Sequence, residues 1–228
     1  MLEVFIQKRR RRFTVDATFE VSAGESVGLF GPSGAGKSTV LSCIAGIASP
    51  DSGVVRWNGV EMLGLPPYRR PFGYLTQDAL LFPHLSAGAN IAFGLTPASA
   101  AHSLLEQIKE EFALRDLWRL RPGELSGGQA QRVAMARMLA RAPRVVLLDE
   151  PFFGLDRIVV RELIGSLRRW IAQHKCAMIV VDHQEQVLRA LCPFVNVMAE
   201  GRIVQRGSWD DVSRAPADPA VAALLRPL

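Results

Sequence analysis

Two patterns of apolar residues divide the chain into predicted strands and helices. Apolar and polar residues alternate over 2–6 and 15–21, which predicts two half-buried strands that pair antiparallel around a basic turn. Short and nearly continuous apolar runs at 26–30, 144–149 and 177–182 predict strands buried on both faces. Apolar residues at helical spacing separate these runs, so the order of elements predicts a parallel sheet covered by helices on both faces.

The middle of the chain carries helical signals where the flanking parts carry strand signals. From 78 to 140, apolar residues recur at helical spacing in two stretches, and strand patterns vanish. We therefore expect one domain over 1–228, in which 1–77 and 141–228 form the core and 78–140 is an inserted helical subdomain.

Weaker patterns predict the remaining elements. The helix after the first buried run is expected to carry its apolar face as far as Ile47. A further pair of strands, at 54–57 and 72–75, brackets a turn-rich segment. After a strand at 194–198 we expect a short edge strand at 203–204, and then a tail that ends in a weak helix.

The composition is that of a globular protein. Of the 228 residues, 49% are hydrophobic and 21% are charged, which excludes disordered, collagen-like and coiled-coil chains. The longest apolar runs, such as 176–181, are far shorter than the roughly 20 residues that cross a bilayer, so we expect no membrane span. Apolar residues precede the basic cluster at the N-terminus, the reverse of a secretory signal, which predicts a cytoplasmic protein.

Cysteine and histidine residues show no spacing typical of disulfides or of a structural metal site. The cysteines are odd in number and lack a C-x-x-C pair, so we expect buried, inert thiols at Cys43, Cys176 and Cys192. The four histidines are scattered, and the sequence implies no transition-metal site.

A run of five basic residues, Lys8–Arg12, lies in a chain whose formal net charge is +5. This charge is compatible with an anionic ligand or an acidic surface nearby. The simplest interpretation of the run is a solvated loop, and the second is a loop that faces a nucleotide. Binding of nucleic acid or lipid ranks last because no other basic cluster extends the patch, so we expect no nucleic-acid partner.

Residues 31–38 match the phosphate-binding pattern G-x-x-x-x-G-K-[ST] in full, between a predicted strand and a predicted helix. The glycines let the backbone curl so that its N–H groups, and the positive end of the helix dipole, face phosphate oxygens. Lys37 is expected to bridge the phosphates, and the Ser38 hydroxyl to bind Mg²⁺. The residues expected to bind the nucleotide here are Gly31, Pro32, Ser33, Gly34, Ala35, Gly36, Lys37, Ser38 and Thr39.

Two carboxylates follow the apolar strand that ends near 149. Asp149 closes this strand, where a carboxylate can hold a metal ion beside bound phosphates. Glu150 comes next and is placed to activate a water molecule as a general base. By itself an Asp-Glu pair after a strand is more typical of a helix N-cap, but the phosphate-binding pattern favours the catalytic interpretation.

The segment Leu125–Gln129, continued by 131–134, resembles the signature of ATP-binding cassette (ABC) transporter ATPases. Ser126 is a typical N-cap, and the helix that it begins presents free N–H groups to an anion. The resemblance implies ATP and Mg²⁺ as cofactors and a head-to-tail pair of two copies. The residues of one copy that then close over the ATP of the other are Ser126, Gly127, Gly128 and Gln129.

Three further residues match the family order. The resemblance makes Gln77 a contact of Mg²⁺ and the lytic water, Asp156 a residue that crosses the dimer interface, and His183 a contact of the γ-phosphate. Each has a plainer interpretation when taken alone. Gln77 is then a strand terminus, Asp156 an N-cap, and His183 an N-cap or a core histidine. Their order along almost the whole chain favours the family roles.

Two departures from the family pattern concern the base and the interface. Where family members usually place an aromatic residue that stacks on adenine, this chain has its basic run, with Phe13 at the end. Phe13 and an arginine plane are the two candidates for that contact. The segment before Asp156 is Phe-Gly-Leu, whereas Ser-Ala-Leu is more usual.

The resemblance implies an α/β fold, that of a P-loop NTPase. Its RecA-like core sheet is mostly parallel, and it carries an N-terminal antiparallel β subdomain and an inserted α-helical subdomain. The implied function is that of the ATPase subunit of an importer, in which ATP-driven dimer closure drives solute import through a separate permease. The implied location is peripheral, on the cytoplasmic face of the inner (plasma) membrane.

The expected partners are the permease subunits, a second copy of the chain and an external solute-binding protein that acts through the permease. Segment 81–85 is expected to receive a short helix of the permease. Importers of thiamine, molybdate, sulfate, iron or polyamines are the most similar subgroups. The short tail after 204 leads us to expect no C-terminal regulatory domain.

Other classes of protein fit less well. DNA-repair cassettes usually carry a long coiled coil between the phosphate-binding loop and the signature, and the interval between Ser38 and Leu125 is too short for one. Translation cassettes generally carry two copies of the domain in one chain. A small-molecule kinase would leave the signature without a role.

Overall fold

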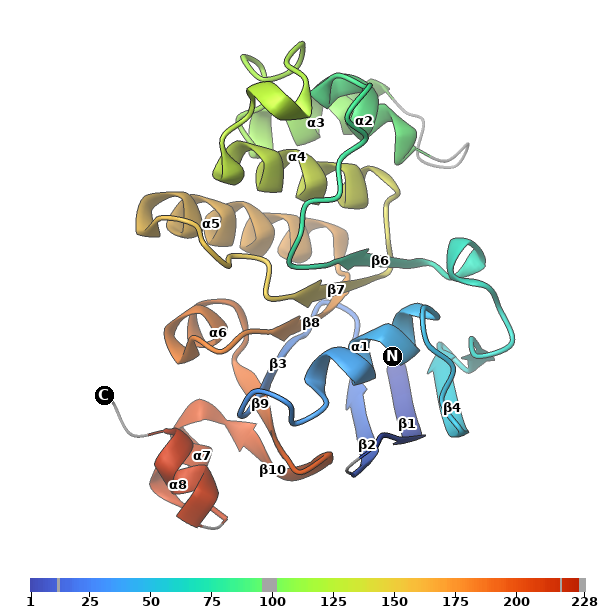
Figure 1. The fold of residues 1–228 in the computed structure, drawn as a ribbon, viewed down its shortest axis with the longest axis vertical. Coiled ribbons are helices and arrows are strands. Elements are labelled where there is room, and N and C mark those ends of the chain that lie inside the picture. Colours follow the sequence, from blue (N-terminus) through green and yellow to red (C-terminus); the bar gives the residue numbers. More distant parts are fainter. Residues whose placement is uncertain (12, 96–101, 218, 226–228) are drawn as a thin grey trace.

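The computed structural model describes residues 1–11, 13–95, 102–217 and 219–225. Its strands are β1 (Leu2–Arg9), β2 (Thr14–Val21), β3 (Ser26–Phe30), β4 (Ser52–Trp57), β5 (Val60–Glu61), β6 (Phe72–Leu75), β7 (Val145–Asp149), β8 (Ala177–Val181), β9 (Phe194–Ala199) and β10 (Arg202–Ser208). In the described part of the chain they form a ten-stranded sheet in the order β5-β4-β1-β2-β10-β9-β3-β8-β7-β6 (Figure 1).

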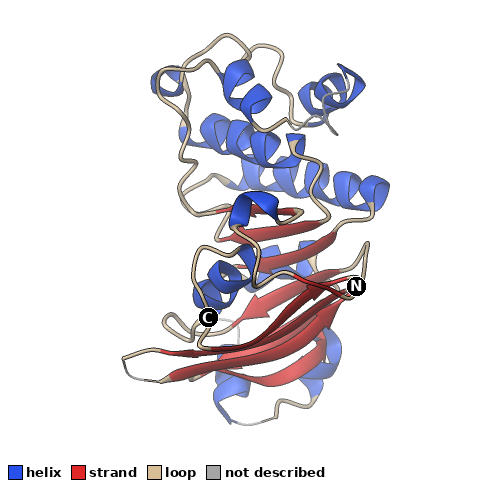
Figure 2. Ribbon diagram, turned by 90° about the vertical axis from the view of Figure 1, so that its right-hand side faces the viewer, coloured by secondary structure: helices blue, strands red, loops and turns tan. Residues whose placement is uncertain are grey.

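Helices lie on both faces of this sheet (Figure 2). They are α1 (Lys37–Ala45), α2 (Ala87–Phe93), α3 (His102–Glu111), α4 (Gly127–Ala140), α5 (Arg157–His174), α6 (Glu185–Leu191), α7 (Trp209–Arg214) and α8 (Pro219–Leu224), with 3₁₀ turns at Pro67–Arg69 and Pro122–Glu124. Among the described residues, no helix has both the length and the apolar character that a membrane span requires.

The side of the sheet that contains β6, β7, β8, β3 and β9 is parallel throughout. Alternate residues of its buried strands enter two separate cores, because successive side chains of a strand point to opposite faces. In β7, Val145 and Leu147 join the core that contains α1, whereas Val146 and Leu148 join the core that contains α5. The parallel sheet covered on both faces is confirmed, and the carboxyl ends of its strands share one edge.

The other side of the sheet is antiparallel. β1 pairs with β2 from Leu2–Val21 to Arg9–Thr14, and β4 flanks β1 on its other side. The alternating pattern explains this arrangement, since Leu2, Val4 and Ile6 are buried while Phe5 on the opposite face is exposed. The predicted antiparallel pair is confirmed.

Two sequence-based expectations about the strands are wrong in detail. β4 and β6 do not pair with each other, because β4 joins β1 and β5 whereas β6 joins β7 at the far end of the sheet. β10 is not an edge strand: it pairs with β9, and Arg202 pairs with Asp16 of β2, so it connects the two sides of the sheet. The tail ends in a short helix, α8, as expected, and a further short helix, α7, precedes it.

Helix α1 follows the phosphate-binding segment and is shorter than its apolar pattern suggests. It ends at Ala45 because Gly46 takes a left-handed conformation (φ 84°) as its C-cap. Ile47 therefore lies beyond the helix and is 66% exposed, contrary to the expectation that it belongs to the apolar face. The end of α1 is held by Arg70, whose guanidinium donates to the carbonyls of Cys43 (3.1 Å) and Ile44 (2.7 Å).

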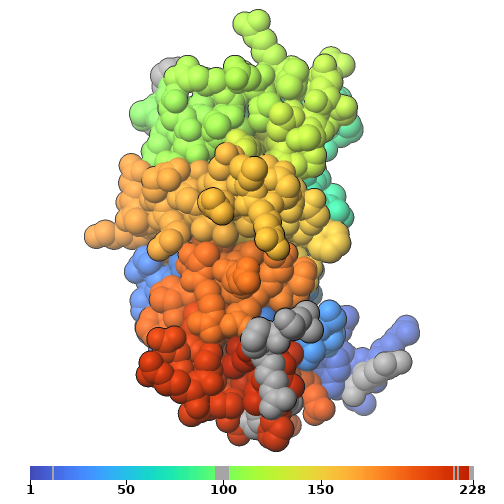
Figure 3. Space-filling view, turned by 90° about the vertical axis from the view of Figure 1, so that its left-hand side faces the viewer, coloured from blue at the N-terminus to red at the C-terminus, as the bar shows by residue number. Residues whose placement is uncertain are grey.

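Helices α2, α3 and α4 lie together beyond α5, as Figures 1 and 3 show. Among the described residues of 78–140 no strand is present. In Figure 3, α5 forms a band between this helical block and α6–α8. The block is attached to α5 by polar contacts as well as by the core: the Ser166 hydroxyl donates to the carbonyl of Glu111 (2.6 Å), and Arg132 pairs with Glu162.

We predict that Arg70→Ala lowers the free energy of unfolding by about 3 kcal/mol, because four backbone carbonyls around a side chain that is 4% exposed lose their donor. Urea unfolding followed by circular dichroism measures this change. The neighbouring Arg69→Ala is the control and should change stability by less than about 0.5 kcal/mol. Equal effects of the two substitutions would contradict the role given to Arg70.

Candidate functional site

The phosphate-binding loop between β3 and α1 is packed so closely against β9 and β2 that Gly31 and Gly36 leave no room for a side chain. A Cβ atom on Gly31 would lie 2.0 Å from the carbonyl oxygen of Met198, and Gly31 has φ 155°. A Cβ on Gly36 (φ 102°) would lie 2.7 Å from Cγ2 of Val15. The loop is also bonded to the β9–β10 turn, where Gly201 N donates to the Ala35 carbonyl (3.1 Å). The predicted curl is therefore present and fixed by its surroundings.

Lys37 lies inside this loop. Its side chain is 6% exposed, and its ammonium donates to the carbonyls of Gly31 and Pro32, both at 2.9 Å. Burial lowers the pKa of the Lys37 ammonium, against the opposing influence of the Glu150, Asp149 and Asp182 carboxylates. The charge is thus held at the centre of the loop, and the first-turn N–H groups of α1 lie behind it without intrahelical acceptors.

Asp149, at the end of β7, is held by two hydroxyl groups. The Ser38 hydroxyl donates to its Oδ1 (2.9 Å), and the Tyr74 hydroxyl of β6 donates to its Oδ2 (3.1 Å). Burial raises the pKa of Asp149, and these two hydrogen bonds act against that rise. Burial also raises the pKa of Tyr74 to about 12, so the phenol keeps its proton. The structure thus brings Ser38 and Asp149 together, as the sequence indicated.

Glu150 follows Asp149 in a left-handed conformation (φ 48°), which is uncommon for a residue with a side chain. Its N–H donates to the carbonyl of Val181 (2.8 Å) and so continues the pairing of β7 with β8 by one residue. The carboxylate is partly buried and lies 3.8 Å from Nδ1 of His183, which follows β8. The preceding Asp182 is buried and caps the next turn by accepting from Gln184 N (2.8 Å). The ends of β7 and β8 therefore bring Glu150 and His183 together.

Gln77 and Asp156 lie next to the ends of regular elements: Gln77 follows β6, and Asp156 precedes α5. Gln77 is exposed, two residues beyond the end of β6 at Leu75, so the predicted strand terminus is close to the observed one. Asp156 is the N-cap of α5, where its Oδ1 accepts from the N–H groups of Ile158 and Val159, both at 3.0 Å. The plainer N-cap interpretation of Asp156 is thus correct as far as one chain is concerned.

The signature segment begins α4 and has the expected cap. The Ser126 hydroxyl accepts from Gln129 N (3.3 Å), and Gln129 Oε1 accepts from Ser126 N (2.9 Å). The helix is tied to the loop after Glu150, because the Gln131 amide donates to the Pro151 carbonyl (2.7 Å). Gly128 faces the side of α5, where an added Cβ would lie 3.1 Å from Cγ1 of Val159.

A cavity of about 420 Å³ opens over the phosphate-binding loop. The residues that line it are Arg10, Phe13, Ser33, Gly34, Gly36, Lys37, Ser38, Thr39 and Glu150. All of them belong to the core of the same chain, whereas the signature residues Ser126–Gln129 do not line it. One chain therefore contains a phosphate-binding cavity and, outside that cavity, the capped N-terminus of α4.

Sequence reasoning missed Tyr74 as a site residue and did not single out Arg10 among the arginines that it considered for the nucleotide. Tyr74 lies in a strand, β6, that the sequence predicted. Its partner Asp149 is 75 residues away along the chain, so no local pattern indicates the contact between them. Arg10 belongs to the basic run, whose second interpretation was a loop facing a nucleotide. The cysteines are buried as expected, and burial raises the pKa of Cys176 to about 11.

Residues 15–153 match the family described as ABC transporter. The chain belongs to this family. As an ABC transporter ATPase it binds and hydrolyses ATP, and the predicted family and enzyme class are confirmed.

Several proteins that are similar to this chain are import ATP-binding proteins. The molybdate/tungstate import protein WtpC of Thermococcus kodakarensis is 40% identical over 96% of this chain and 68% of its own length. The Fe(3+) ions import protein FbpC 3 of Rhodococcus jostii is 40% identical over 91% of this chain and 61% of its own length. The thiamine import protein ThiQ of Escherichia coli is 38% identical over 90% of this chain and 89% of its own length. This ABC transporter chain thus spans about two thirds of the first two relatives and most of the third.

Solved structures confirm the predicted α/β fold of an ABC ATPase. An ATP-binding subunit of an ABC transporter has a TM-score of 0.85 at 26% identity and covers 99% of this chain and all of that chain. A dimeric ATP-binding cassette in a post-hydrolysis state with ADP and Pi has a TM-score of 0.78 at 25% identity, over 91% of this chain and 98% of that one.

We predict that Tyr74→Phe lowers the free energy of unfolding of this ABC ATPase by about 1 kcal/mol, because the buried Asp149 carboxylate loses a hydrogen-bond donor. Urea unfolding in the absence of nucleotide measures the change. Tyr68, the other tyrosine of the chain, is 68% exposed, so Tyr68→Phe is a matched control with an expected change near zero. Identical midpoints for both variants and the wild type would contradict the contact.

Proposed function

We propose that this chain is the ATP-hydrolysing subunit of an importer, and that two copies sandwich ATP and drive a separate membrane permease. The observation that supports this most is the division of the site within one chain. The phosphate-binding loop, Asp149 and Glu150 converge on one edge of the sheet, while the capped signature helix lies outside their cavity. An ATP bound by the first group leaves its outer side open for the signature of another copy.

The oxygen donors beside the phosphate-binding loop fit Mg²⁺. The Ser38 hydroxyl and the Asp149 carboxylate lie 2.9 Å apart at the start of α1, and hard cations prefer such oxygen ligands. We assign these two residues, together with Gln77, to the metal. When bound beside ATP, Mg²⁺ neutralises negative charge on the phosphate oxygens.

The residues of the chain divide the chemistry of hydrolysis between them. The glycine-lined N–H groups and Lys37 hold the phosphates, and Thr39 continues this contact at the start of α1. Glu150 is the general base that accepts the proton of the attacking water, and its left-handed backbone aims the carboxylate at the cavity. His183, 3.8 Å from Glu150, contacts the γ-phosphate.

The second copy supplies the other half of the site. Ser126, Gly127, Gly128 and Gln129 of one chain approach the ATP held by the other, with free N–H groups facing the γ-phosphate. Large apolar side chains flank the capping Asp156 at the surface: Phe153 is 57% exposed and Ile158 is 71% exposed. A head-to-tail pair would cover both, which supports placing Asp156 at the interface.

A second exposed apolar area supports a permease contact. Leu80 and Phe93 are each 68% exposed. The ring of Phe93 packs edge-on against the ring of Phe82, with their centroids 4.6 Å apart. The loop that carries Phe82 is fixed by the buried Asn90, whose side chain accepts from Phe82 N (2.8 Å) and donates to the Phe82 and Leu85 carbonyls (both 3.2 Å). We infer that a permease helix docks here and that helices α2, α3 and α4 move with it.

The solute is selected outside this chain. The named relatives are import proteins for molybdate or tungstate, ferric ions and thiamine, although each is 38% to 40% identical to this chain. We therefore assign solute choice to the permease and an external solute-binding protein. In this arrangement the chain lies at the cytoplasmic face of the membrane and is held there by the permease.

We predict that Glu150→Gln binds Mg-ATP but lowers the turnover rate at least about 100-fold, because the attacking water loses its base. The variant should accumulate as an ATP-loaded dimer on size-exclusion chromatography. Glu20→Gln, at an exposed carboxylate of β2, is the control and should hydrolyse ATP at the wild-type rate. Normal turnover by Glu150→Gln would remove Glu150 from its assigned role.

Lys37→Ala is expected to act on binding itself. The loss of a charge-assisted contact to the phosphates should weaken ATP affinity at least about tenfold in isothermal titration calorimetry. Unchanged affinity would contradict the assignment of the cavity to the nucleotide.

We predict that Phe93→Ser uncouples the chain from its permease, because it removes the exposed ring from the proposed docking area. ATPase activity of the isolated subunit should stay at the wild-type level, while co-purification with the permease subunits should fall at least about fivefold. Val60→Ser, at an exposed apolar residue on β5, is the control. Equal co-purification of both variants would place the permease contact elsewhere.

A further inference from the structure

The β1–β2 turn carries basic residues that differ in what they face. Backbone and side-chain bonds to Asp51 fix its first part: Arg9 N donates to Asp51 Oδ2 (2.6 Å), and the Lys8 ammonium pairs with Oδ1 (3.0 Å). The turn itself is closed by a bond from Arg10 N to the carbonyl of Phe13 (2.8 Å). Arg10 and Phe13 are thus held next to each other by the backbone.

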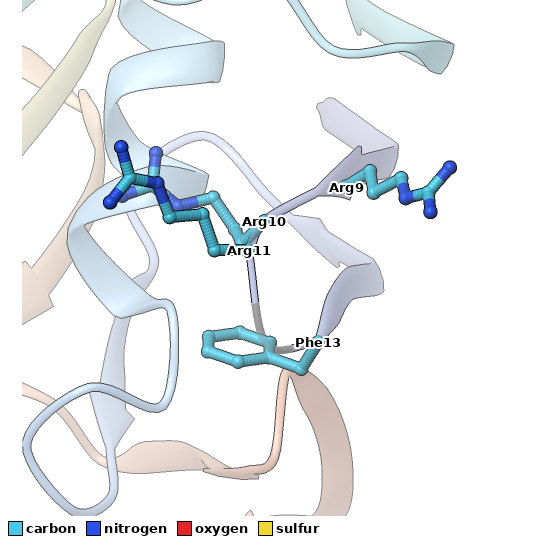
Figure 4. A pocket seen from close by; sticks show the side chains of 4 residues that line it. All are labelled: Arg9, Arg10, Arg11 and Phe13. Carbon is cyan, nitrogen blue, oxygen red and sulfur yellow. The ribbon is translucent and has the colours of Figure 1, made fainter.

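Figure 4 shows the directions of these side chains. Arg10 and Arg11 extend to the same side of the turn as the Phe13 ring, and Arg9 extends to the opposite side. Of the three arginines, Arg10 lines the cavity over the phosphate-binding loop, together with Phe13, Lys37 and Ser38. The basic run therefore contains one residue that shares a cavity with the phosphate site and another, Arg9, that does not.

The Arg10 guanidinium has no ion-pair or hydrogen-bond partner among the described residues. Among the ion pairs and side-chain hydrogen bonds of the described residues, the Arg10 guanidinium takes part in none. The other cation of the cavity, Lys37, already donates to the carbonyls of Gly31 and Pro32. A guanidinium offers several donors in a planar fork that matches phosphate oxygens, so Arg10 is a cation of this cavity that can bind an anion without giving up a protein partner among the described residues.

We propose that Arg10 binds the phosphate chain of the nucleotide from the β1–β2 turn, and that Phe13 is left as the aromatic contact of the base. This inference rests on the proposed nucleotide site and adds to it a second cation beside Lys37, supplied by the β1–β2 turn.

Isothermal titration calorimetry of the full chain with AMP-PNP, ADP and adenosine tests the proposal. Arg10→Ala should weaken AMP-PNP and ADP binding about three- to tenfold and leave adenosine binding within about twofold of the wild type. Arg10→Lys should recover part of the loss because it restores the charge. The difference between Arg10→Ala and the wild type should shrink in 0.5 M KCl, since salt screens an exposed charge (a Debye length of about 4 Å).

Arg9→Ala is the matched control, with a side chain of the same kind on the opposite side of the turn. It should bind all three ligands like the wild type. Equal affinities of Arg10→Ala and Arg9→Ala would overturn the proposal. A loss of adenosine binding as large as the loss of AMP-PNP binding would also overturn it, since Arg10 would then contact the base. Absence of AMP-PNP binding by the wild type would instead contradict the nucleotide site itself.

Discussion

The close contact between the phosphate-binding loop and the β9–β10 turn fixes the geometry of the whole site. Gly31 faces the carbonyl of Met198 where no Cβ fits, and Gly201 in the turn donates to the carbonyl of Ala35. Gly201 itself lies against β2, where an added Cβ would be 2.3 Å from the carbonyl of Thr14. Three backbone segments from both sides of the sheet therefore meet at one point, and the loop cannot move without separating them.

The parallel side of the sheet adds the chemistry to this fixed loop. Because β3, β7 and β8 run parallel, their carboxyl ends share one edge, and the residues after them meet there. Burial of Asp149 in this position is unfavourable for its charge, and the hydroxyls of Ser38 and Tyr74 offset part of that effect. The site is thus a set of buried polar groups that stabilise each other through hydrogen bonds. It lies beside the cavity over the phosphate-binding loop.

Sequence reasoning located most of this site because its chemistry lies in short contiguous segments. The phosphate-binding loop, the Asp149–Glu150 pair and the Ser126 cap each combine a strand or helix end with a residue type that only a few structures require. It failed where contacts join distant segments. Arg70 and Tyr74 act on residues 27 and 75 positions away, and nothing in their own neighbourhoods signals it.

The error at β10 has the same origin. Its residues are mostly half-exposed, which is the pattern of an edge strand, yet β2 and β9 flank it because the chain returns to join the two sides of the sheet. The position of Arg10 likewise depends on the folded β1–β2 turn. Among the described arginines of the basic run, Arg10 is the one that lines the cavity over the phosphate-binding loop. The sequence pattern of a segment predicts its secondary structure, but it does not predict which distant segments pack beside it.

In the proposed dimer, the phosphate-binding loop of one chain and the signature of another enclose one ATP. Site-directed cross-linking tests it most directly, because the native cysteines are buried and will not compete. Chains with Glu150→Gln and Ser33→Cys are mixed with chains that carry Glu150→Gln and Gly127→Cys, both at exposed positions. The account predicts a disulfide-linked dimer of the two different chains that forms only with Mg-ATP. Full ATP binding without such a cross-link would contradict it.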